Sequence, residues 1–230
     1  MGLSLFDETA GSFAAGTDMQ LARNQYVRGE RFLEAVLAVT PPSGYILDYG
    51  CGPGRLARLI GQRGFRVHGV DPSKGMIDEA RKLRLDGTAV TFEICADSGD
   101  DLASNRYDAV VCSSVIEYVE NCAHLLLNFR RCLKKGGTLI LSYANRNSLW
   151  RSYAVWKTSG RQPHYSLQHH LWNFAECDRQ LRRSGFEVFG AVKFFDSPFD
   201  QHPVLAVIGR LELVGTLGLV TARAIEAATD

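Results

Sequence analysis

Three glycines in alternate positions, Gly50, Gly52 and Gly54, lie between a short apolar run and a helix-like run in the stretch LDYGCGPGRLARLI. Glycine tolerates positive φ and lets main-chain atoms approach a ligand closely. The free N–H groups at the start of a helix also suit a phosphate or a carboxylate. We therefore expect a ligand against Gly50 and Gly52, and tight packing of the following helix at Gly54. A purely structural turn is the alternative.

The stretch departs from two common phosphate-binding patterns. The dinucleotide fingerprint GxGxxG requires glycine at the position of Arg55, and the Gly-Lys-Ser/Thr ending of a P-loop is absent. Asp48, at the end of the apolar run, would repel a pyrophosphate but attract an ammonium group. The stretch therefore favours an ammonium-bearing ligand over a dinucleotide.

Two more aspartates follow the next two strand-like runs. Asp71 comes 21 positions after Gly50, where a carboxylate can accept both hydroxyls of a ribose. Asp97 is placed to accept a hydrogen bond from the exocyclic amine of a base. Singly, each aspartate is more often a cap or a turn residue. Together with Asp48 they favour an adenosine-like ligand that carries an amino-acid tail.

Alternating strand-like and helix-like runs must position these residues. Helical crossovers connect parallel strands, and helices on both faces explain the near-continuous apolar runs AVVC and TLILSY. Ligands of such sheets lie at the carboxyl ends of the strands. The sequence predicts strands over 45–49, 65–70, 90–95, 107–112 and 138–143. It predicts helices over 55–62, over 73–84 with Ser73 as the N-cap, and over 121–133, the last ending at Gly136-Gly137.

The alternation stops after residue 143. Residues 144–173 are aromatic and basic, a helix is expected over 174–184, and strands over 186–194 and 217–222 suggest a hairpin at the sheet edge. We expect one domain with four parts: a helical lid (1–40), a cofactor-binding core (41–143), an acceptor-site insert (144–173), and a C-terminal helix and hairpin (174–230). The insert contains Trp150, Tyr153, Trp156, Tyr165 and Trp172, with His164, His169 and His170.

Composition restricts the class of partner. The 230 residues have a formal net charge of +1, which gives no general attraction to nucleic acid or anionic membranes. The six cysteines form no CxxC pair, which indicates reduced, partly buried thiols in the cytoplasm and no zinc site. From the acidic start of the sequence we expect no signal peptide, and we expect no membrane helix, since no clean apolar segment reaches the ~18 residues that one needs. Peripheral membrane association and oligomeric state stay open, and no metal is expected.

The segment ILDYGCGPGRLARLIGQRGFRVHGVDPSKGMIDEARK resembles the cofactor-binding half of a class I S-adenosylmethionine (SAM)-dependent methyltransferase. FEICADSGDDL and YDAVVCSSVIEYVEN…LKKGGTLILSYANR resemble the motifs that follow, so the likeness covers residues 46–146. A weaker likeness in HHLWNFAECDRQLRRSGFEV points to small-molecule enzymes, similar in layout to ubiquinone-biosynthesis O-methyltransferases. The resemblance implies an α/β, Rossmann-like doubly wound sheet of seven strands, mostly parallel, with residues 217–222 as an antiparallel edge strand and a helical insert after strand five.

The resemblance also implies a role for each strand-end residue in binding SAM. At the methionine end, Asp48 would receive the ammonium, directly or through water, and the glycine loop and the main chain after strand four would lie beside the methionine. At the adenosine end, one aspartate would bind the ribose and the other the adenine amino group. The methionine-end residues are Asp48, Gly50, Cys51, Gly52, Gly54 and Ser113, and the adenosine-end residues are Asp71, Pro72, Met76, Ala96 and Asp97.

Methyl transfer from a sulfonium requires alignment of the acceptor and exclusion of water, and a base helps when the acceptor is a phenol or an alcohol. Related small-molecule enzymes often have a histidine before the helix that begins here near Phe174. His169 or His170 is thus the candidate base, and a structural or surface histidine is the alternative. We expect a small aromatic or hydrophobic acceptor that is methylated at oxygen. Tyr26 and Arg28 are expected to touch the methionine carboxylate or the acceptor, unless they belong to a solvated lid.

Five alternatives remain open. A small-metabolite N- or C-methyltransferase shares the same cofactor site. An NAD-dependent oxidoreductase is disfavoured by Arg55, and a non-catalytic binding module by the complete set of cofactor positions. DNA methyltransferases that act on amines have Asp/Asn-Pro-Pro-aromatic after strand four, where this chain reads Cys112-Ser113-Ser114-Val115, which together with the net charge of +1 disfavours a nucleic acid substrate. A protein substrate is harder to exclude, although the aromatic insert suits a small hydrophobic acceptor better.

Overall fold

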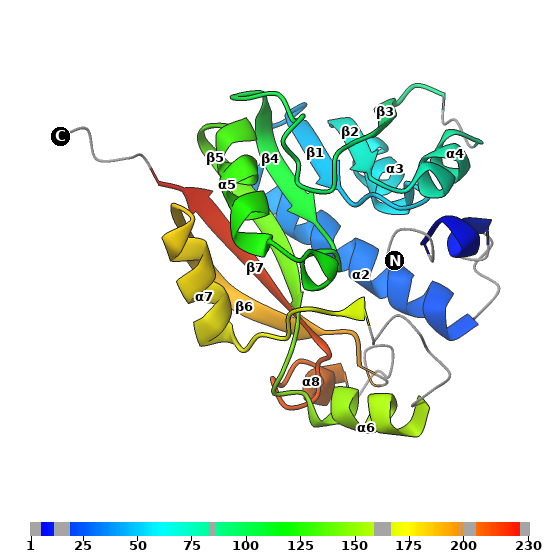
Figure 1. Cartoon of the computed structure of the whole chain (residues 1–230), viewed down its shortest axis with the longest axis vertical. Coiled ribbons are helices and arrows are strands. Elements are labelled where there is room, and N and C mark those ends of the chain that lie inside the picture. Colours follow the sequence, from blue (N-terminus) through cyan, green and yellow to red (C-terminus); the bar gives the residue numbers. More distant parts are fainter. Residues whose placement is uncertain are drawn as a thin grey trace.

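The computed structural model describes residues 6–11, 19–82, 86–158, 167–197, 199 and 206–225. These residues form a central sheet with helices on both faces (Figure 1). The strand order is β3-β2-β1-β4-β5-β7-β6. The strands are β1 (Tyr45–Tyr49), β2 (Arg66–Asp71), β3 (Ala89–Ile94), β4 (Tyr107–Cys112), β5 (Leu133–Ala144), β6 (Phe186–Phe195) and β7 (Leu217–Ala224).

The doubly wound sheet predicted from the sequence is confirmed. Strands β1 to β5 pair in parallel, and β7 runs antiparallel to both β5 and β6. The order reverses between β1 and β4, because the chain moves outward from β1 to β3 and then returns to the other side of β1. This reversal makes a crevice at the carboxyl ends of β1 and β4, where ligands of such folds bind.

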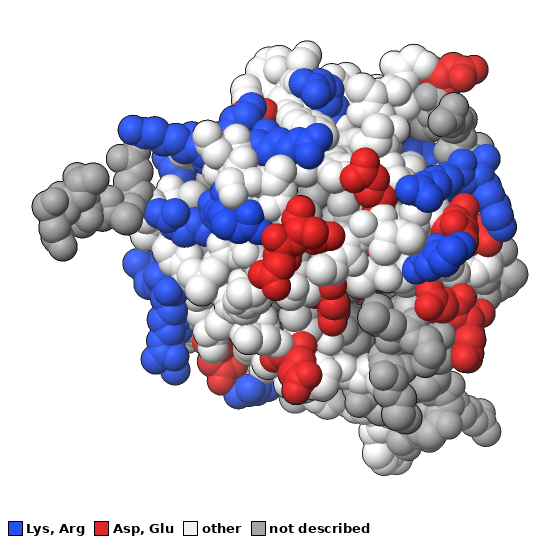
Figure 2. Space-filling model, turned by 45° about the horizontal axis from the view of Figure 1, so that its top comes forward, with Lys and Arg blue, Asp and Glu red and all other residues white. Residues whose placement is uncertain are grey.

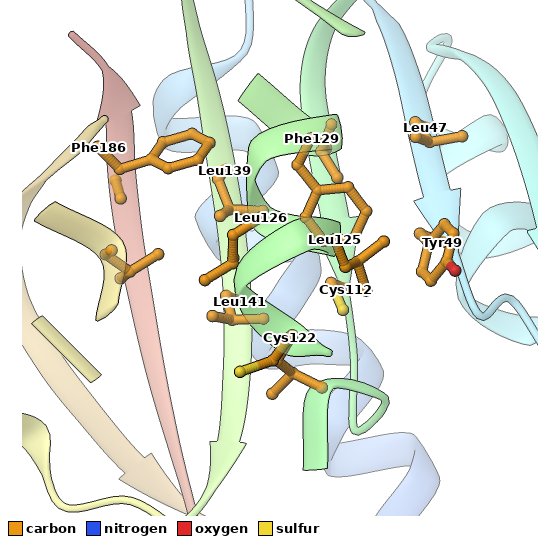
Figure 3. Packing of buried hydrophobic residues seen from close by; sticks show 14 of the residues in the cluster. Leu47, Tyr49, Cys112, Cys122, Leu125, Leu126, Phe129, Leu139, Leu141 and Phe186 are labelled. Carbon is orange, nitrogen blue, oxygen red and sulfur yellow. The ribbon is translucent and has the colours of Figure 1, made fainter. Parts of the chain in front are cut away.

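Helices cover the sheet in two layers. Alternate strand residues face opposite sides. Ile46 belongs to the apolar layer that includes α2 and α3, whereas Leu47 belongs to the opposite layer, which includes α5 and, farther along the sheet, α7. Figure 3 shows this second layer, with Leu125 and Phe129 of α5 against the strands. The helices are α2 (Met19–Val39), α3 (Arg55–Gly61), α4 (Lys74–Lys82), α5 (Cys122–Cys132), α6 (Leu149–Thr158), α7 (Phe174–Arg183) and α8 (Ala206–Gly209), with a 3-10 turn η1 (Ile116–Tyr118) and a short helix over residues 6–11.

Side-chain caps fix where the site-forming helices begin. The Ser73 hydroxyl accepts a hydrogen bond from the Met76 N–H at 3.1 Å, as the predicted cap before α4 requires. Asn173 and Glu176 form a reciprocal capping box at the start of α7. These caps determine the exact residues at which the chain leaves the crevice and enters a helix.

Two details of the predicted architecture are wrong. The C-terminal strand β7 is antiparallel but does not lie at the edge, because β6 pairs with its outer side. After β5 the chain passes to β6 and leaves room for one strand between β5 and β6. Strand β7 fills this place, and its main chain pairs with the hydrogen-bonding groups of both neighbours. The other error concerns Gly136-Gly137, which lies within β5 and not at the end of α5. Leu133 is already extended and paired with Tyr107, so the glycines form an irregularity inside the strand.

Candidate functional site

A cavity of ≈ 400 Å³ lies between α2 and the carboxyl ends of β1 and β4. This volume falls within the range of small-molecule sites. The cavity therefore occupies the crevice at which the strand order reverses. Its lining includes four residues predicted at the methionine end, Asp48, Gly50, Cys51 and Ser113, together with Tyr26 and Arg28 of α2.

The three glycines of the loop lie against different neighbouring side chains. All have positive φ: 70° at Gly50, 52° at Gly52 and 76° at Gly54. A Cβ on Gly50 would lie 2.3 Å from Val115 Cγ2, and a Cβ on Gly54 would lie 2.4 Å from Phe92 Cζ. At Gly52 the nearest atom is 3.9 Å away, so only this glycine faces open space. Gly50 thus makes room for Val115, which the sequence alone did not indicate.

Main-chain hydrogen bonds attach the glycine loop to the end of β2. The N–H groups of Gly50 and Cys51 donate to the Val70 carbonyl at 2.8 Å and 3.0 Å. The Gly52 N–H donates to Asp71 Oδ2 at 2.9 Å. The loop and the carboxylate predicted to bind ribose are thereby held as one unit, so their relative position is set before any ligand binds.

Asp48 lines the cavity, and one of its carboxylate oxygens has no hydrogen-bond partner. Its side chain is 1% exposed, and Oδ2 has no hydrogen-bond partner. Burial, with a smaller effect of the nearby Asp71 charge, raises the pKa of Asp48 to about 7. An unpaired buried carboxylate is costly, and a ligand ammonium would both satisfy the oxygen and lower the pKa. The residue therefore fits the amino-acid end of SAM.

Asp71 is oriented by two main-chain donors. Oδ1 accepts from the Ser73 N–H at 2.9 Å, and Oδ2 accepts from Gly52 as described above. Burial raises the pKa of Asp71, and these hydrogen bonds oppose the rise. Each carboxylate oxygen has a second lone pair. The group can therefore accept ribose hydroxyls without giving up its structural bonds.

The loop after β3 is attached to β1 by one phenol. The Tyr49 hydroxyl donates to the Asp97 carbonyl at 2.8 Å and lies 3.3 Å from the Ala96 carbonyl. Ala96 and the Asp97 carboxylate are exposed, Pro72 is partly exposed and Met76 is buried near Gly52. These predicted adenosine-end residues follow β2 and β3 and do not line the cavity, whereas four of the predicted methionine-end residues do.

The candidate bases lie away from the cavity lining. The main-chain N–H groups of His169 and His170 donate to the Glu117 carbonyl at 2.7 Å and 3.3 Å. The His169 side chain is exposed, and His170 Nε2 lies 3.2 Å from the Glu120 carbonyl. Neither imidazole lines the cavity. These hydrogen bonds connect the insert to the turn after β4. The role of either histidine as a base stays a prediction. His164 lies outside the described residues.

Sequence reasoning missed Glu117, in η1 after β4. Its side chain is 2% exposed, and Oε2 has no hydrogen-bond partner. Burial raises the pKa of Glu117 to about 7, although the charges of Arg28 and Arg151 oppose the rise. The available signal was a lone acid in the apolar run VIEYV, directly after a strand whose carboxyl end faces the crevice.

The described residues show no cluster of three His, Cys, Asp or Glu side chains that could hold a metal. Nor does any helix within the described ranges combine the length and apolarity needed to cross a membrane. All six cysteines are buried and unpaired, as expected. On the face in Figure 2, basic and acidic side chains both occur and neither sign covers the surface alone, in agreement with the small net charge.

Comparison with known proteins agrees with this geometry. The sequence pattern of a family described as a methyltransferase domain matches residues 20–189. A ubiquinone biosynthesis O-methyltransferase of Pseudomonas aeruginosa is 31% identical over 172 residues, which are 70% of this chain and 72% of the relative. A SAM-dependent methyltransferase from Mesorhizobium loti superposes with a TM-score of 0.64 at 25% identity, over 83% of this chain and 96% of the other. The Haloferax volcanii methyltransferase that was solved with the activator Trm112 has the same fold, with a TM-score of 0.71 at 21% identity over 98% of both chains.

Proposed function

This chain belongs to the class I SAM-dependent methyltransferases, and from that premise we propose that it methylates a hydroxyl oxygen of a small aromatic or hydrophobic acceptor. The observation that carries the proposal is the unpartnered carboxylate oxygen of Asp48 in the lining of the cavity beside the glycine loop. The relatives named as O-methyltransferases support oxygen as the methylated atom. The buried, unpaired cysteines support activity in the cytoplasm.

SAM supplies an activated methyl group on a sulfonium when it is bound. The residues of this chain hold and orient it: Asp48 accepts from the ammonium, Asp71 accepts from the ribose, and Gly52 leaves room beside the methionine. Arg28 of α2 lines the same cavity and supplies a positive charge for the methionine carboxylate. The loop at Asp97 receives the adenine amino group.

The insert supports an apolar, aromatic acceptor. Figure 1 shows α6 at the end of the sheet toward which β1 and β4 point. The Trp150 ring of this helix lies 5.3 Å from the ring of Tyr153 and 6.5 Å from that of Phe199. Aromatic side chains of this kind provide large apolar surfaces for a flat ligand.

Two measurements test the proposal. Calorimetric titration with S-adenosylhomocysteine (SAH) and with NAD should show binding of SAH alone. Purified protein should then be incubated with SAM and a set of phenols, catechols, alcohols and amines, with SAH formation and the methylated atom read by mass spectrometry and NMR. Methylation of hydroxyl groups is expected. Methylation of amines or carbons only would contradict the choice of oxygen, and binding of NAD in place of SAH would contradict the donor.

A further inference from the structure

The buried carboxyl of Glu117 is the strongest unexplained group in the described part of the molecule. Three elements besides its own bring charges to it: Arg28 of α2, Arg151 of α6 and Asp196 after β6. Tyr118 is the neighbouring titratable group on η1. Within this charged cluster Glu117 Oε2 still has no hydrogen-bond partner, although a buried carboxylate is stable only when it is fully paired.

Both arginines of the cluster are already engaged elsewhere. Arg28 forms an ion pair with Asp196 at 3.4 Å. Arg151 donates to the Gln168 side-chain oxygen, and the Gln168 amide donates to the Tyr118 hydroxyl at 3.2 Å. The cluster is therefore a polar site in which both arginines are held by acceptors other than Glu117. The buried Arg28 Nε also has no hydrogen-bond partner. The cluster thus leaves a carboxylate oxygen and a guanidinium N–H unpaired, which indicates a missing polar partner of ligand origin.

The order of strands locates this oxygen relative to the methyl donor. The residues assigned to adenine, ribose and methionine follow β3, β2 and β1, which are successive strands of the sheet. The next strand is β4, and Glu117 follows it. The Cys112 thiol at the end of β4 lies within electrostatic range of both Glu117 and Asp48, because both charges raise its pKa. Glu117 does not itself line the cavity. It follows the strand next to the methionine end, on the side where the insert lies.

We propose that Glu117 is the catalytic base that receives the hydroxyl proton of the acceptor, in place of His169 or His170. The inference rests on the proposed O-methylation. In the step, an acceptor oxygen forms a bond to the methyl carbon, the methyl–sulfur bond breaks with its electron pair kept by sulfur, and the hydroxyl proton passes to Glu117 Oε2. The main-chain N–H groups of His169 and His170 hold the Glu117 carbonyl, a contact in which the imidazoles take no part.

This assignment predicts how the rate depends on pH. A carboxylate accepts a proton only when it is ionised, so kcat should rise with pH through the Glu117 pKa and then level off. The groups that face the carboxyl set this pKa: Arg28 and Arg151 lower it, and Asp196 and burial raise it. Exclusion of water from the carboxyl also keeps the transferred proton within the site.

Glu117→Gln keeps the size of the side chain but cannot take a proton, and Glu117→Asp keeps the acid at a shorter reach. Glu120→Gln is the matched control, because the Glu120 side chain is exposed three residues away. A His169→Ala/His170→Ala double variant tests the alternative bases. The SAH dissociation constant, measured by calorimetry without an acceptor, reports whether the cofactor site of each variant is intact.

We expect Glu117→Gln to lower kcat by at least about 100-fold and to remove the pH-dependent rise, with the SAH dissociation constant changed less than about twofold. Glu117→Asp should retain a pH-dependent but slower rate, and the other two variants should stay near wild type. A Glu117→Gln variant that keeps more than about a tenth of kcat, or loses kcat and SAH affinity in parallel, overturns the proposal. If that variant does not fold, a Glu117→Asp variant that keeps the wild-type kcat overturns it.

A readout without turnover separates this inference from the proposed function. The Glu117 carboxyl can be observed by NMR in SAH-bound protein labelled with 13C at glutamate Cδ, and assigned by its loss in Glu117→Gln. Addition of the probe 4-nitrocatechol should shift this resonance and leave that of Glu120 in place. No shift overturns the role of Glu117. A shift without methylation of any hydroxyl acceptor supports the role and refutes the proposed O-methylation.

Discussion

At the scale of single residues, the site depends on side chains that are absent as much as on those present. Gly50 and Gly54 leave space for Val115 and Phe92, whereas Gly52 leaves space that no protein atom fills. Substitutions at these glycines therefore have different physical costs, although all three share a positive φ.

Gly50→Ala should destabilise the fold by at least about 2 kcal/mol, because a left-handed residue is strained and its Cβ meets Val115. Gly52→Ala should cost only about 1 kcal/mol, from strain alone. Gly52→Ala should nonetheless weaken SAH binding at least about tenfold, since its Cβ occupies ligand space. Urea denaturation and calorimetry measure the two effects. Equal losses of stability in the two variants would contradict the different neighbours.

Asp48 should make SAH binding depend on pH. The pKa of about 7 in the free protein falls when an ammonium pairs with the carboxyl, so binding at pH 7 should release about half a proton. Calorimetry in two buffers of different ionisation enthalpy measures this release. Asp48→Asn should abolish it and weaken SAH binding about tenfold or more. The exposed Asp78→Asn serves as the control, and an unchanged proton release in Asp48→Asn would refute the assignment.

At the scale of elements, the site is a set of strand ends held in register by bonds between neighbouring strands. The glycine loop after β1 is bound to the end of β2, and Tyr49 of β1 holds the loop after β3. Parallel pairing sets the distance between these ends, so each predicted contact to SAM depends on the strands beside it.

Tyr49→Phe should loosen the loop that carries Asp97 without emptying the core. Loss of the phenol hydrogen bonds should cost about 1 kcal/mol of stability. If that loop binds adenine, SAH affinity should fall about fivefold, while the affinity for free methionine stays unchanged. Tyr45→Phe is a matched control at the start of the same strand, where the hydroxyl contacts Arg106 on the surface. Equal SAH affinity in both variants would exclude an anchoring role for the loop.

At the scale of the whole molecule, the fold keeps two carboxyls in an environment that disfavours their charge. The pKa values of both Asp48 and Glu117 are raised to about 7 in the folded chain, from 3.8 and 4.5. Native proteins retain such unfavourable groups where function requires them. The free protein therefore gives up stability at neutral pH that a bound ligand can restore.

Stability without ligand should fall as pH rises from 5 to 7. In this window the folded state binds more protons at Asp48 and Glu117 than the unfolded state does, so the free energy of unfolding decreases with pH. Burial also raises the pKa of Asp71, which acts in the same direction, whereas the lowered pKa of His68 acts in the opposite direction as a single group. The melting temperature should drop by at least about 5 °C, and Asp48→Asn should flatten the slope. A melting temperature that rises across this window would contradict the raised pKa values.

The sequence was most informative where chemistry follows local order. Strand β4 was predicted with its exact bounds, because an apolar run between polar residues marks a buried parallel strand. The cap at Ser73 followed from hydrogen-bonding capacity alone. Positions of aspartates at strand ends required only the alternation of strands and helices, since that pattern implies one sheet with all carboxyl ends of the core strands at one edge.

What the sequence determined by itself is an adenosine-like ligand with an amino-acid tail, because Asp48, the glycine loop and Asp71 lie within one continuous stretch whose spacing reflects a single strand–helix–strand unit. The resemblance of that same stretch to SAM-dependent methyltransferases identified the ligand as the methyl donor. Only the tertiary structure decided the outer place of β6 and the burial of Glu117. Burial depends on segments far apart in the chain: Arg28 and Asp196, 168 positions apart, meet over the same turn. Glu117 is buried and unpaired because these distant segments come together, and no local sequence pattern encodes such a contact.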